Sequence, residues 1–254
     1  MNDHMSATSA AAPTVSVVVP VRNEADNVVP LVDEITAALD GRWAYEIIYV
    51  NDGSTDATAE RLAAIMTKRG NLRQIRHEKS SGQSAAVRSG VRAARGAIVA
   101  TLDGDGQNDP SFLPDVITAI ENSGGRIGLA AGQRVGRKDT GFKKFQSRTA
   151  NKVRRWALSD GTRDTGCGLK AFRREVFLSL PYFDGLHRFL PALVRREGFD
   201  IAYVDVTDRP RYSGVSNYGF FDRLWIGIMD LAGVWWLIRR KRSTPVATEV
   251  VRHD

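Results

Sequence analysis

Five short apolar runs rich in β-branched residues recur through the first half of the sequence. Each is bounded by polar residues or glycine, as buried strands are, and they cover residues 15–19, 46–50, 72–75, 97–102 and 127–131. Amphipathic stretches of helical length separate them, at residues 27–39, 55–68, 83–95 and 110–121. Strands that alternate with helices predict an α/β fold with a doubly wound, mainly parallel sheet.

Two of the predicted helices have start signals in the sequence. Asp109 precedes Pro110, which is the pattern of an N-cap followed by proline at the first helical position. Ser54 or Thr55 is expected to cap the helix at 55–68. Beyond residue 134 the pattern weakens, and we expect only a basic amphipathic stretch at 142–158, a short helix at 189–196 and a strand at 201–206.

Polar side chains follow three of the predicted strands, at the point where each strand ends. They are Asn23 and Glu24 after the first strand, Asp52 and Ser54 after the second, and Asp103 and Asp105 after the fourth. Each alone is a common cap or turn residue. Because ligands of open α/β sheets bind beyond the carboxyl ends of the strands, their coincidence on one edge favours a binding site there.

Asp103 and Asp105 are close enough in sequence to ligate one hard cation, and Gln107 can supply a further oxygen. Oxygen ligands of this kind suit Mg²⁺ or Mn²⁺ with positions left open for phosphate. A carboxylate pair that works without metal is the alternative. A calcium loop is excluded because Asn108 stands at its glycine position and Pro114 at its glutamate position.

Composition narrows the function classes. Cys167 is the single cysteine, which excludes an internal disulfide framework and a cysteine-rich zinc site. The N-terminus has no basic segment followed by an apolar stretch, so we expect a cytoplasmic protein, peripheral at the cytoplasmic face of the membrane. The formal net charge is +7, but no nucleic-acid-binding motif accompanies it, and we expect no nucleic acid partner.

Four motifs then carry a family resemblance. They are PVRNEADN, VNDGSTDAT, GQSAAVRSGVRAARG and TLDGDGQNDP, in this order along the chain. Together they resemble the family 2 glycosyltransferases, and most closely their polyprenyl-phosphate and dolichol-phosphate sugar transferase branch. The resemblance runs over residues 15–218 and implies a Rossmann-like fold of the GT-A type. It also implies a UDP- or GDP-linked sugar donor.

The resemblance assigns roles to the residues at the strand ends. The implied nucleotide ligands are Pro20, Asn23, Glu24, Asp52 and Ser54. The implied ligands of the metal and the donor diphosphate are Asp103, Asp105 and Gln107.

The second half carries the resemblance to the lipid-phosphate branch. The implied ligands of the acceptor phosphate are Ser147, Arg148, Lys170, Arg209 and Arg211. Three residues depart from the family pattern: Cys167 replaces serine, Lys170 replaces arginine and Asn217 replaces lysine. Because lysine is a point charge and arginine a bidentate fork, the first two departures leave the geometry of phosphate binding open.

We therefore expect transfer of a hexose from a nucleotide diphosphate sugar to a polyprenyl phosphate of the undecaprenyl or dolichyl type, with inversion. A phosphate monoester with a second pKa of about 6 is already largely ionised at neutral pH and needs no general base. Asp103, Asp105 and Arg148 are the expected catalytic residues. A saccharide hydroxyl acceptor is the alternative, with Asp164 as the candidate base.

The C-terminal stretch predicts an amphipathic helix at 219–242, after a flexible tail at 1–14 and a catalytic domain at 15–218, and before a tail at 243–254. It holds Trp225, Trp235 and Trp236 and ends in a basic run, but its clean apolar part of residues 231–238 is too short to span a membrane. A helix at the membrane surface and a helix packed on protein both fit this pattern. A homo-oligomer is compatible with the second.

Other function classes find less support. A nucleotidyltransferase usually has a glycine-rich basic loop directly after its first strand, where this chain has PVRNE. A nucleic-acid-binding protein rests on the net charge alone, and an inactive sugar-binding module conflicts with the intact Asp103 and Asp105. His77 and His187 have no motif context, and no catalytic triad is recognisable.

Overall fold

The computed structural model describes residues 12–135, 154, 157–158, 160–162, 164–209 and 220–241, and of residues 220–225 the backbone alone. In the first half, strands and helices alternate as β1 (Val15–Val21), α1 (Ala25–Leu39), β2 (Tyr45–Asp52), α2 (Thr58–Met66), β3 (Leu72–His77), α3 (Gln83–Ala93) and β4 (Ile98–Thr101). The elements that follow are η1 (Pro110–Phe112), α4 (Leu113–Glu121), β5 (Ile127–Arg134), β6 (Lys170–Arg173), α6 (Arg174–Ser179), η2 (Leu186–Arg188), α7 (Leu190–Arg196), β7 (Asp200–Val206) and α8 (Phe220–Arg240).

The strands form one sheet in the order β3-β2-β1-β4-β6-β5-β7. All neighbouring pairs are parallel except those of β6, which runs antiparallel to both β4 and β5. The predicted α/β fold with a mainly parallel sheet is confirmed. The sequence analysis missed β6, because four residues are too few to establish a strand periodicity.

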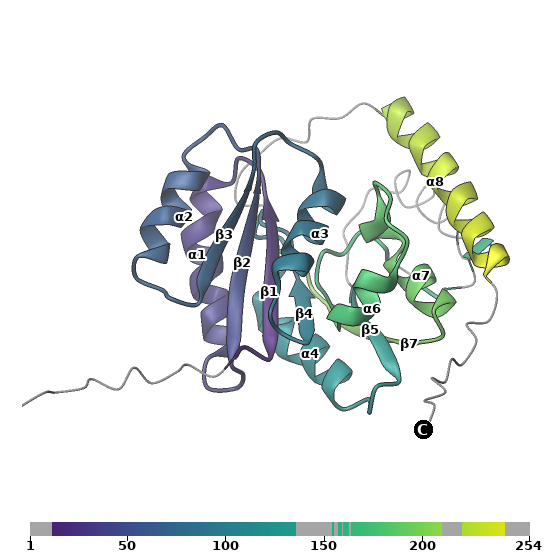
Figure 1. Ribbon diagram of the computed structural model, residues 1–254, viewed down its shortest axis with the longest axis horizontal. Coiled ribbons are helices and arrows are strands. Elements are labelled where there is room, and N and C mark those ends of the chain that lie inside the picture. Colours follow the sequence, from purple (N-terminus) through teal and green to yellow (C-terminus); the bar gives the residue numbers. More distant parts are fainter. Residues whose placement is uncertain are drawn as a thin grey trace, which may run out of the picture.

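Helices cover both faces of the sheet (Figure 1). Alternate residues of β1 point to opposite faces, so Val17 and Val19 join the core under α1 and α4, whereas Val18 joins the core under α3, α6 and α7. Both cores are built from fully buried aliphatic side chains, among them Ile35 of α1 and Val91 of α3. These two apolar layers fix the sheet, and thereby the positions of the strand ends.

The helix starts are partly as predicted. Asp109 caps as expected: its carboxylate accepts a hydrogen bond from the backbone N–H of Ser111 at 2.9 Å, although the first turn is the 3₁₀ turn η1. The cap predicted at Ser54 or Thr55 is wrong, because α2 begins only at Thr58. At that start, Asp56 accepts a hydrogen bond from the backbone N–H of Thr58 at 3.0 Å. Ser54 and Thr55 belong instead to the loop after β2, where they form hydrogen bonds with Asn23.

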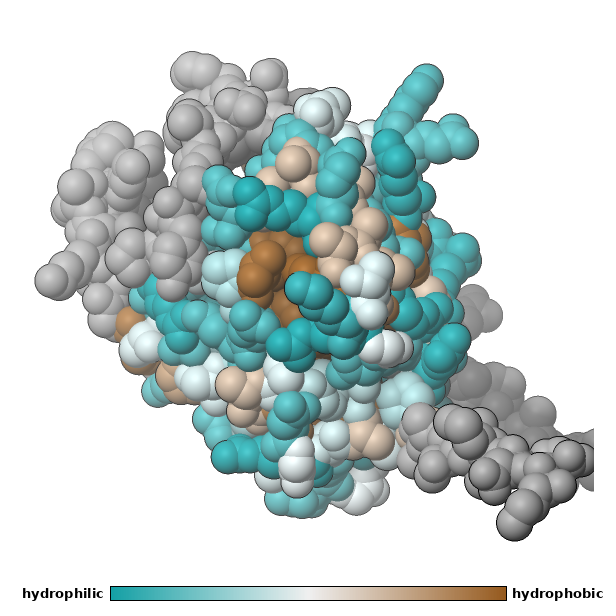
Figure 2. All heavy atoms as spheres, turned by 90° about the vertical axis from the view of Figure 1, so that its left-hand side faces the viewer, coloured by the Kyte–Doolittle hydropathy of each residue, from teal (hydrophilic) through white to brown (hydrophobic). Residues whose placement is uncertain are grey.

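The outer face of α1 and α2 is mostly hydrophilic around one apolar area (Figure 2). A shallow groove between the two helices includes Val29 and Ile65. The ion pair between Arg69 and Asp33, at 2.7 Å, ties α2 to α1 beside it.

One side of helix α8 packs on the core that lies under α3, α6 and α7. Val234 is buried there, and Leu231 and Leu237 lie partly buried beside it. Arg196 of α7 donates a hydrogen bond to the carbonyl of Leu237 at 3.1 Å. None of the helices in the described part of the chain combines the length and the apolarity needed to cross a membrane.

Candidate active site

The loops after β1 and β2 are fastened to each other by side chains predicted to bind nucleotide. Asn23 has a positive φ of 57°, and its carboxamide oxygen accepts a hydrogen bond from the backbone N–H of Thr55 at 2.8 Å. In return, the backbone N–H of Asn23 donates to Ser54 Oγ at 3.0 Å. The structure therefore brings Asn23 and Ser54 together.

Asp52 organises the loop between β3 and α3. Its carboxylate accepts hydrogen bonds from His77 Nδ1, Ser80 Oγ and the backbone N–H groups of Ser81 and Gly82, at 2.7 to 2.9 Å. Burial raises the pKa of Asp52, but these hydrogen bonds outweigh burial and hold the pKa below its usual value. The nucleotide contact expected of Asp52 stays a prediction.

Asp103 and Asp105 lie together just beyond β4. Asp103 Oδ1 accepts a hydrogen bond from Gln83 Nε2 at the start of α3, at 2.7 Å. Asp105 Oδ1 accepts one from the backbone N–H of Gln107 at 3.1 Å. Gln107 in turn accepts a backbone hydrogen bond from Arg209 through its carbonyl oxygen, at 2.9 Å. The three predicted metal ligands thus share one loop.

The electrostatics of this loop favour a bound cation. Burial, and then the negative charge of Asp105, raise the pKa of Asp103 to about 6, while the positive charges of Lys170 and Arg134 oppose the rise. Two carboxylates that repel each other in a buried position are a donor set suited to a hard divalent cation. Among the described residues, no group of three or more His, Cys, Asp or Glu side chains is placed to hold a metal. Metal binding by Asp103, Asp105 and Gln107 stays a prediction.

Two adjoining cavities meet at Asp103. The first, an open cleft of about 370 Å³, is lined by Pro20, Glu24, Asp52, Asp103 and Asp105 among others. Of the predicted nucleotide ligands, Asn23 and Ser54 are not in its wall.

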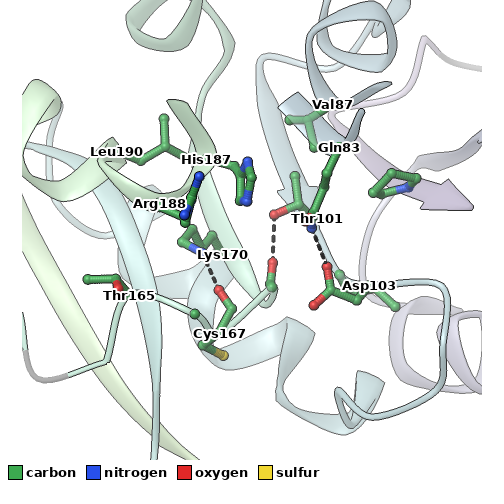
Figure 3. Close-up of a pocket in the computed structure, with 14 residues that line it drawn as sticks. Gln83, Val87, Thr101, Asp103, Thr165, Cys167, Lys170, His187, Arg188 and Leu190 are labelled. Atoms are coloured by element: carbon green, nitrogen blue, oxygen red, sulfur yellow. Dashed lines mark hydrogen bonds between the residues drawn. The ribbon is translucent and has the colours of Figure 1, made fainter. Parts of the chain in front are cut away.

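The second cavity is an enclosed pocket of about 120 Å³ that shares Pro20, Gln83 and Asp103 with the cleft. Figure 3 shows Gln83 and Asp103 on one side of it and Lys170 and Arg188 on the other. We call these two cavities the open cleft and the enclosed pocket.

Lys170 is the buried cation of the enclosed pocket. It begins β6, and its ammonium donates a hydrogen bond to the carbonyl of Cys167. Burial lowers the pKa of Lys170, and the nearby Cys167 and Asp103 oppose this effect. The predicted phosphate ligand Lys170 therefore lies across the enclosed pocket from the predicted metal ligand Asp103, and their charges interact.

Gly168, in the loop before β6, lies close to the carboxylate of Asp103. A Cβ atom added to Gly168 would lie 2.4 Å from Asp103 Oδ2, so only glycine allows the loop before β6 to come this close.

Asp164, the candidate base for a hydroxyl acceptor, forms an ion pair with Arg134. Its two carboxylate oxygens accept hydrogen bonds from Arg134 Nε at 2.5 Å and from a terminal nitrogen of the same guanidinium at 2.9 Å. Arg134 also donates to Asp208 at 3.0 Å. Burial raises the pKa of Asp164, but the hydrogen bonds and charge of Arg134 outweigh it and lower the pKa.

Arg209 contacts two carboxylates. One terminal nitrogen of its guanidinium donates to both oxygens of Glu34 at 2.9 Å, and the other lies 2.6 Å from Asp109 Oδ1. A phosphate would have to compete with these contacts, and Arg209 is in the wall of neither cavity. Of the other predicted phosphate ligands, Ser147, Arg148 and Arg211 lie outside the described residues.

The sequence analysis missed four residues of this site. Gln83, His187 and Arg188 line the enclosed pocket, and His77 supports Asp52. For Gln83 a signal existed, because it stands at the start of a predicted helix within the motif GQSAAVRSGVRAARG. The histidines and Arg188 are brought in by the fold from segments without a recognisable motif.

A comparison with known proteins identifies the family of the chain. The sequence profile described as glycosyl transferase family 2 matches residues 16–180. The chain belongs to glycosyl transferase family 2.

Two relatives of this family 2 chain are polyprenyl-phosphate sugar transferases by name. A dodecaprenyl-phosphate galacturonate synthase of Rhizobium johnstonii is 36% identical, over 89% of this chain and 68% of the relative. An undecaprenyl-phosphate 4-deoxy-4-formamido-L-arabinose transferase of Pectobacterium carotovorum is 31% identical, over 81% of this chain and 63% of the relative. The resemblance to that branch is confirmed, and the chain spans somewhat less than two thirds of the length of the second relative.

Solved structures of the same fold confirm the GT-A type of the family 2 domain. The glucosyl-3-phosphoglycerate synthase of Mycobacterium tuberculosis, in complex with Mn²⁺, UDP and phosphoglyceric acid, superposes with a TM-score of 0.66. The sequences are 20% identical, and the match covers 91% of this chain and 80% of the synthase.

Proposed function

We propose that this family 2 glycosyltransferase moves a sugar from a nucleotide diphosphate sugar to a polyprenyl phosphate. The observation that carries the proposal is the meeting of the two cavities at Asp103. An open cleft at the ends of β1, β2 and β4 suits a nucleoside diphosphate, and the enclosed pocket beside it contains the buried cation Lys170. Both relatives are named for products or acceptors built on polyprenyl phosphate.

The metal assignment rests on Asp103 and Asp105, which would hold Mg²⁺ or Mn²⁺ with Gln107 near them. A divalent cation there would offset the negative charge that grows on the leaving diphosphate. Burial, and then the negative charge of Asp105, raise the pKa of Asp103, and a buried pair of carboxylates of this kind would fit such an ion. The synthase of similar fold has complexes with Mn²⁺ and with Mg²⁺.

The reaction that we propose is a single displacement with inversion. An oxygen of the acceptor phosphate forms a bond to C1 of the sugar as the bond between C1 and the diphosphate oxygen breaks. Lys170 would offset charge on the phosphate groups, and Gln83 holds Asp103 in place by its hydrogen bond. Arg148 remains the proposed acceptor ligand from the sequence resemblance.

The state of Asp164 supports a phosphate acceptor over a hydroxyl acceptor. A hydroxyl acceptor needs a general base with a pKa near the working pH. Asp164 is bound on both oxygens by Arg134 and has a lowered pKa, which makes it a poor base. An ionised lipid phosphate requires no such group.

We further propose a hexose-type donor sugar. Galacturonate, the sugar in the name of the Rhizobium relative, is a six-carbon sugar acid, whereas the other relative is named for an arabinose derivative. Glucose and galacturonate donors are therefore the first pair to compare.

The exposed side of α8 is proposed to rest on a membrane surface, where the lipid acceptor is. Ile226, Met229 and Trp236 are 52%, 57% and 54% exposed, an unusual set of apolar side chains for a surface helix. The guanidinium of Arg239 stacks 4.4 Å above the ring of Trp235, which places a cation beside the aromatic side chains. Tryptophan with basic residues is the composition that favours the headgroup region of anionic lipid.

The experiment combines purified protein, Mn²⁺ or Mg²⁺, a panel of UDP- and GDP-linked sugars, and a short polyprenyl phosphate. Release of nucleoside diphosphate is measured with and without the lipid. We expect lipid-dependent release that Asp105→Ala abolishes and that Asp115→Ala, on the exposed side of α4, leaves unchanged. Release that ignores the lipid but requires a saccharide would instead assign a hydroxyl acceptor.

A further inference from the structure

His187 is held in one orientation by a serine on another element. Its Nδ1 atom lies 2.8 Å from Ser84 Oγ, which belongs to the first turn of α3. Ser84 is buried, whereas His187 lines the enclosed pocket together with Lys170 and Arg188. In Figure 3 the imidazole ring lies between the side of the pocket that holds Gln83 and the side that holds Arg188.

The hydrogen bonds at Ser84 determine which nitrogen of His187 carries the proton. Ser84 Oγ accepts hydrogen bonds from the backbone N–H groups of Gly185, at 3.0 Å, and of His187 itself, at 3.5 Å. A hydroxyl has two acceptor positions and one hydrogen to donate. With both acceptor positions used, the hydroxyl hydrogen is directed to Nδ1 of His187.

A neutral imidazole that accepts at Nδ1 carries its own hydrogen on Nε2. Burial, and then the positive charges of Lys170 and Arg188, lower the pKa of His187 to about 3, so the ring is neutral at physiological pH. Within the part of the chain that the structure describes, His187 therefore has one N–H donor left and no free lone pair. It can donate a hydrogen bond to a ligand in the enclosed pocket, but it cannot act as a general base.

The neighbouring residue adds a second donor without a partner. Arg188 forms an ion pair with Asp230 of α8 at 3.4 Å through a terminal nitrogen, yet its buried Nε–H has no hydrogen-bond partner among the described residues. Buried donors are normally satisfied. Because this nitrogen is itself buried, Arg188 contributes its charge to the pocket wall, and the Nε2–H of His187 is the donor available to a ligand there.

We propose that His187 is a specificity-determining residue that donates its Nε2–H to a hydroxyl oxygen of the donor sugar, and that Ser84 is the positioning residue that fixes this donor. The inference rests on the proposed function, because it takes the ligand to be a nucleotide sugar. A neutral donor matches a neutral hydroxyl, whereas the charged Lys170 and Arg188 match phosphate. The pocket adjoins Asp103, where the proposed diphosphate ends and the sugar begins.

The test compares two amides at position 187. In His187→Gln the amide nitrogen lies where Nε2 was, whereas in His187→Asn it lies nearer the position of Nδ1. Both variants are polar and neutral, so a loss of folding affects them alike, and thermal unfolding of each is measured. The affinities for UDP, GDP and their glucose and galacturonate conjugates are then measured by calorimetry, and kcat/KM is measured with the lipid acceptor.

We expect His187→Gln to bind the sugar conjugate within about threefold of the unmodified chain and His187→Asn to bind it about tenfold more weakly, the factor expected for one hydrogen bond. Affinity for the nucleoside diphosphate alone should be the same in both. Ser84→Ala should weaken binding of the conjugate alone. Ser179→Ala should change nothing, because its hydroxyl donates to the carbonyl of Val176 within α6.

Donors that lack one hydroxyl each complete the test. The penalty of His187→Asn should disappear for one deoxy analogue, and that analogue identifies the hydroxyl. Equal affinities of the Gln and Asn variants, or a penalty that persists for every analogue, would overturn the inference. Because these are binding measurements, they remain decisive if the lipid acceptor proves wrong, and lipid-independent turnover would reject only the proposed acceptor.

Discussion

The two sides of the active site are built differently. On the side of the open cleft, the polar residues follow their strands within a few positions, and backbone N–H groups take part in holding them, as those of Ser81 and Gly82 do for Asp52. On the side of the enclosed pocket, residues distant in sequence meet through side chains, as Arg134 meets Asp164 and Ser84 meets His187. Substitutions on the first side should change the shape of loops, and those on the second side should change charge and hydrogen bonding.

Removal of the metal should have the largest effect, because it acts where the two sides meet. A proposed cation at Asp103 and Asp105 supplies several kcal/mol of charge stabilisation, so a chelator should lower transfer about a thousandfold. Mn²⁺ alone should also raise the melting temperature of the chain by binding the folded state. The measurements are nucleoside diphosphate release and thermal unfolding, each before and after the metal is restored.

Asp105→Asn and Asp115→Asn provide the matched pair for this prediction. The first should lose the thermal response to Mn²⁺, and the second should keep it. An unchanged response in Asp105→Asn would remove Asp105 from the metal site.

Loss of the positive charge of Lys170 should have the second-largest effect on transfer. Lys170→Met keeps the apolar stem but removes the charge across the enclosed pocket from Asp103, and we expect kcat to fall about a hundredfold, as for the loss of one electrostatic contact to the reacting groups. Binding of the nucleoside diphosphate in the open cleft should change little. Lys68→Met, at an exposed position after α2, is the control. Equal loss of nucleotide affinity and kcat would show that the two sides are not separable.

Gly53 tests how strongly the backbone conformation of the loops beside the open cleft affects stability and nucleotide binding. Gly53 has a φ of +68°, and a Cβ there would lie 2.6 Å from the backbone nitrogen of Ser80. Gly53→Ala should lower the free energy of unfolding by about 1–3 kcal/mol and weaken nucleotide binding, because the loop held by Asp52 must move. Gly41→Ala has a similar φ of +73° with nothing within 4 Å, so it should show the cost of the backbone conformation alone. Equal effects in denaturant unfolding would contradict the steric part of the prediction.

The exposed face of α8 should give the smallest effect on stability. Trp235→Ser with Trp236→Ser removes two exposed rings, so the free energy of unfolding should change by no more than about 1 kcal/mol. Sedimentation with anionic liposomes at moderate salt should nevertheless drop several-fold. Val29→Ser with Met66→Ser, on helices α1 and α2, removes a comparable exposed apolar pair and should leave sedimentation unchanged. No sedimentation of the unmodified chain would end the membrane proposal.

The same contrast explains what the sequence could predict. The strands, helices and carboxylates of the first side follow from local patterns, because each polar residue lies next to the strand that positions it. The cap at Asp109 and the position of Asp103 and Asp105 beyond β4 could be predicted in this way, whereas metal binding by the last two stays a prediction. Helix starts failed only where a loop used the expected caps, as at Ser54, which bonds the backbone of Asn23 instead.

The second side depends on contacts that no local pattern encodes. His187 reaches the pocket because α3 and η2 pack together, and its role is visible only with Ser84 beside it. Arg209 is a second case: its sequence context resembles a phosphate-binding loop, and the fold brings it to Glu34 and Asp109, so phosphate binding by Arg209 stays a prediction. Short β6 has too little sequence to reveal its reversed direction.

That reversed direction has a consequence for the segment between Arg134 and Lys170. Because β6 is antiparallel, the chain leaves the sheet after Arg134 and re-enters it at Lys170 on the same edge, where Ala131 pairs with Lys170. The two ends of the segment between them are therefore held on adjacent strands, and Gly168 near its C-terminal end must stay glycine to pass Asp103. We expect that a change of sequence within this segment that keeps residues 164–169 leaves the pairing of β5 with β6 in place.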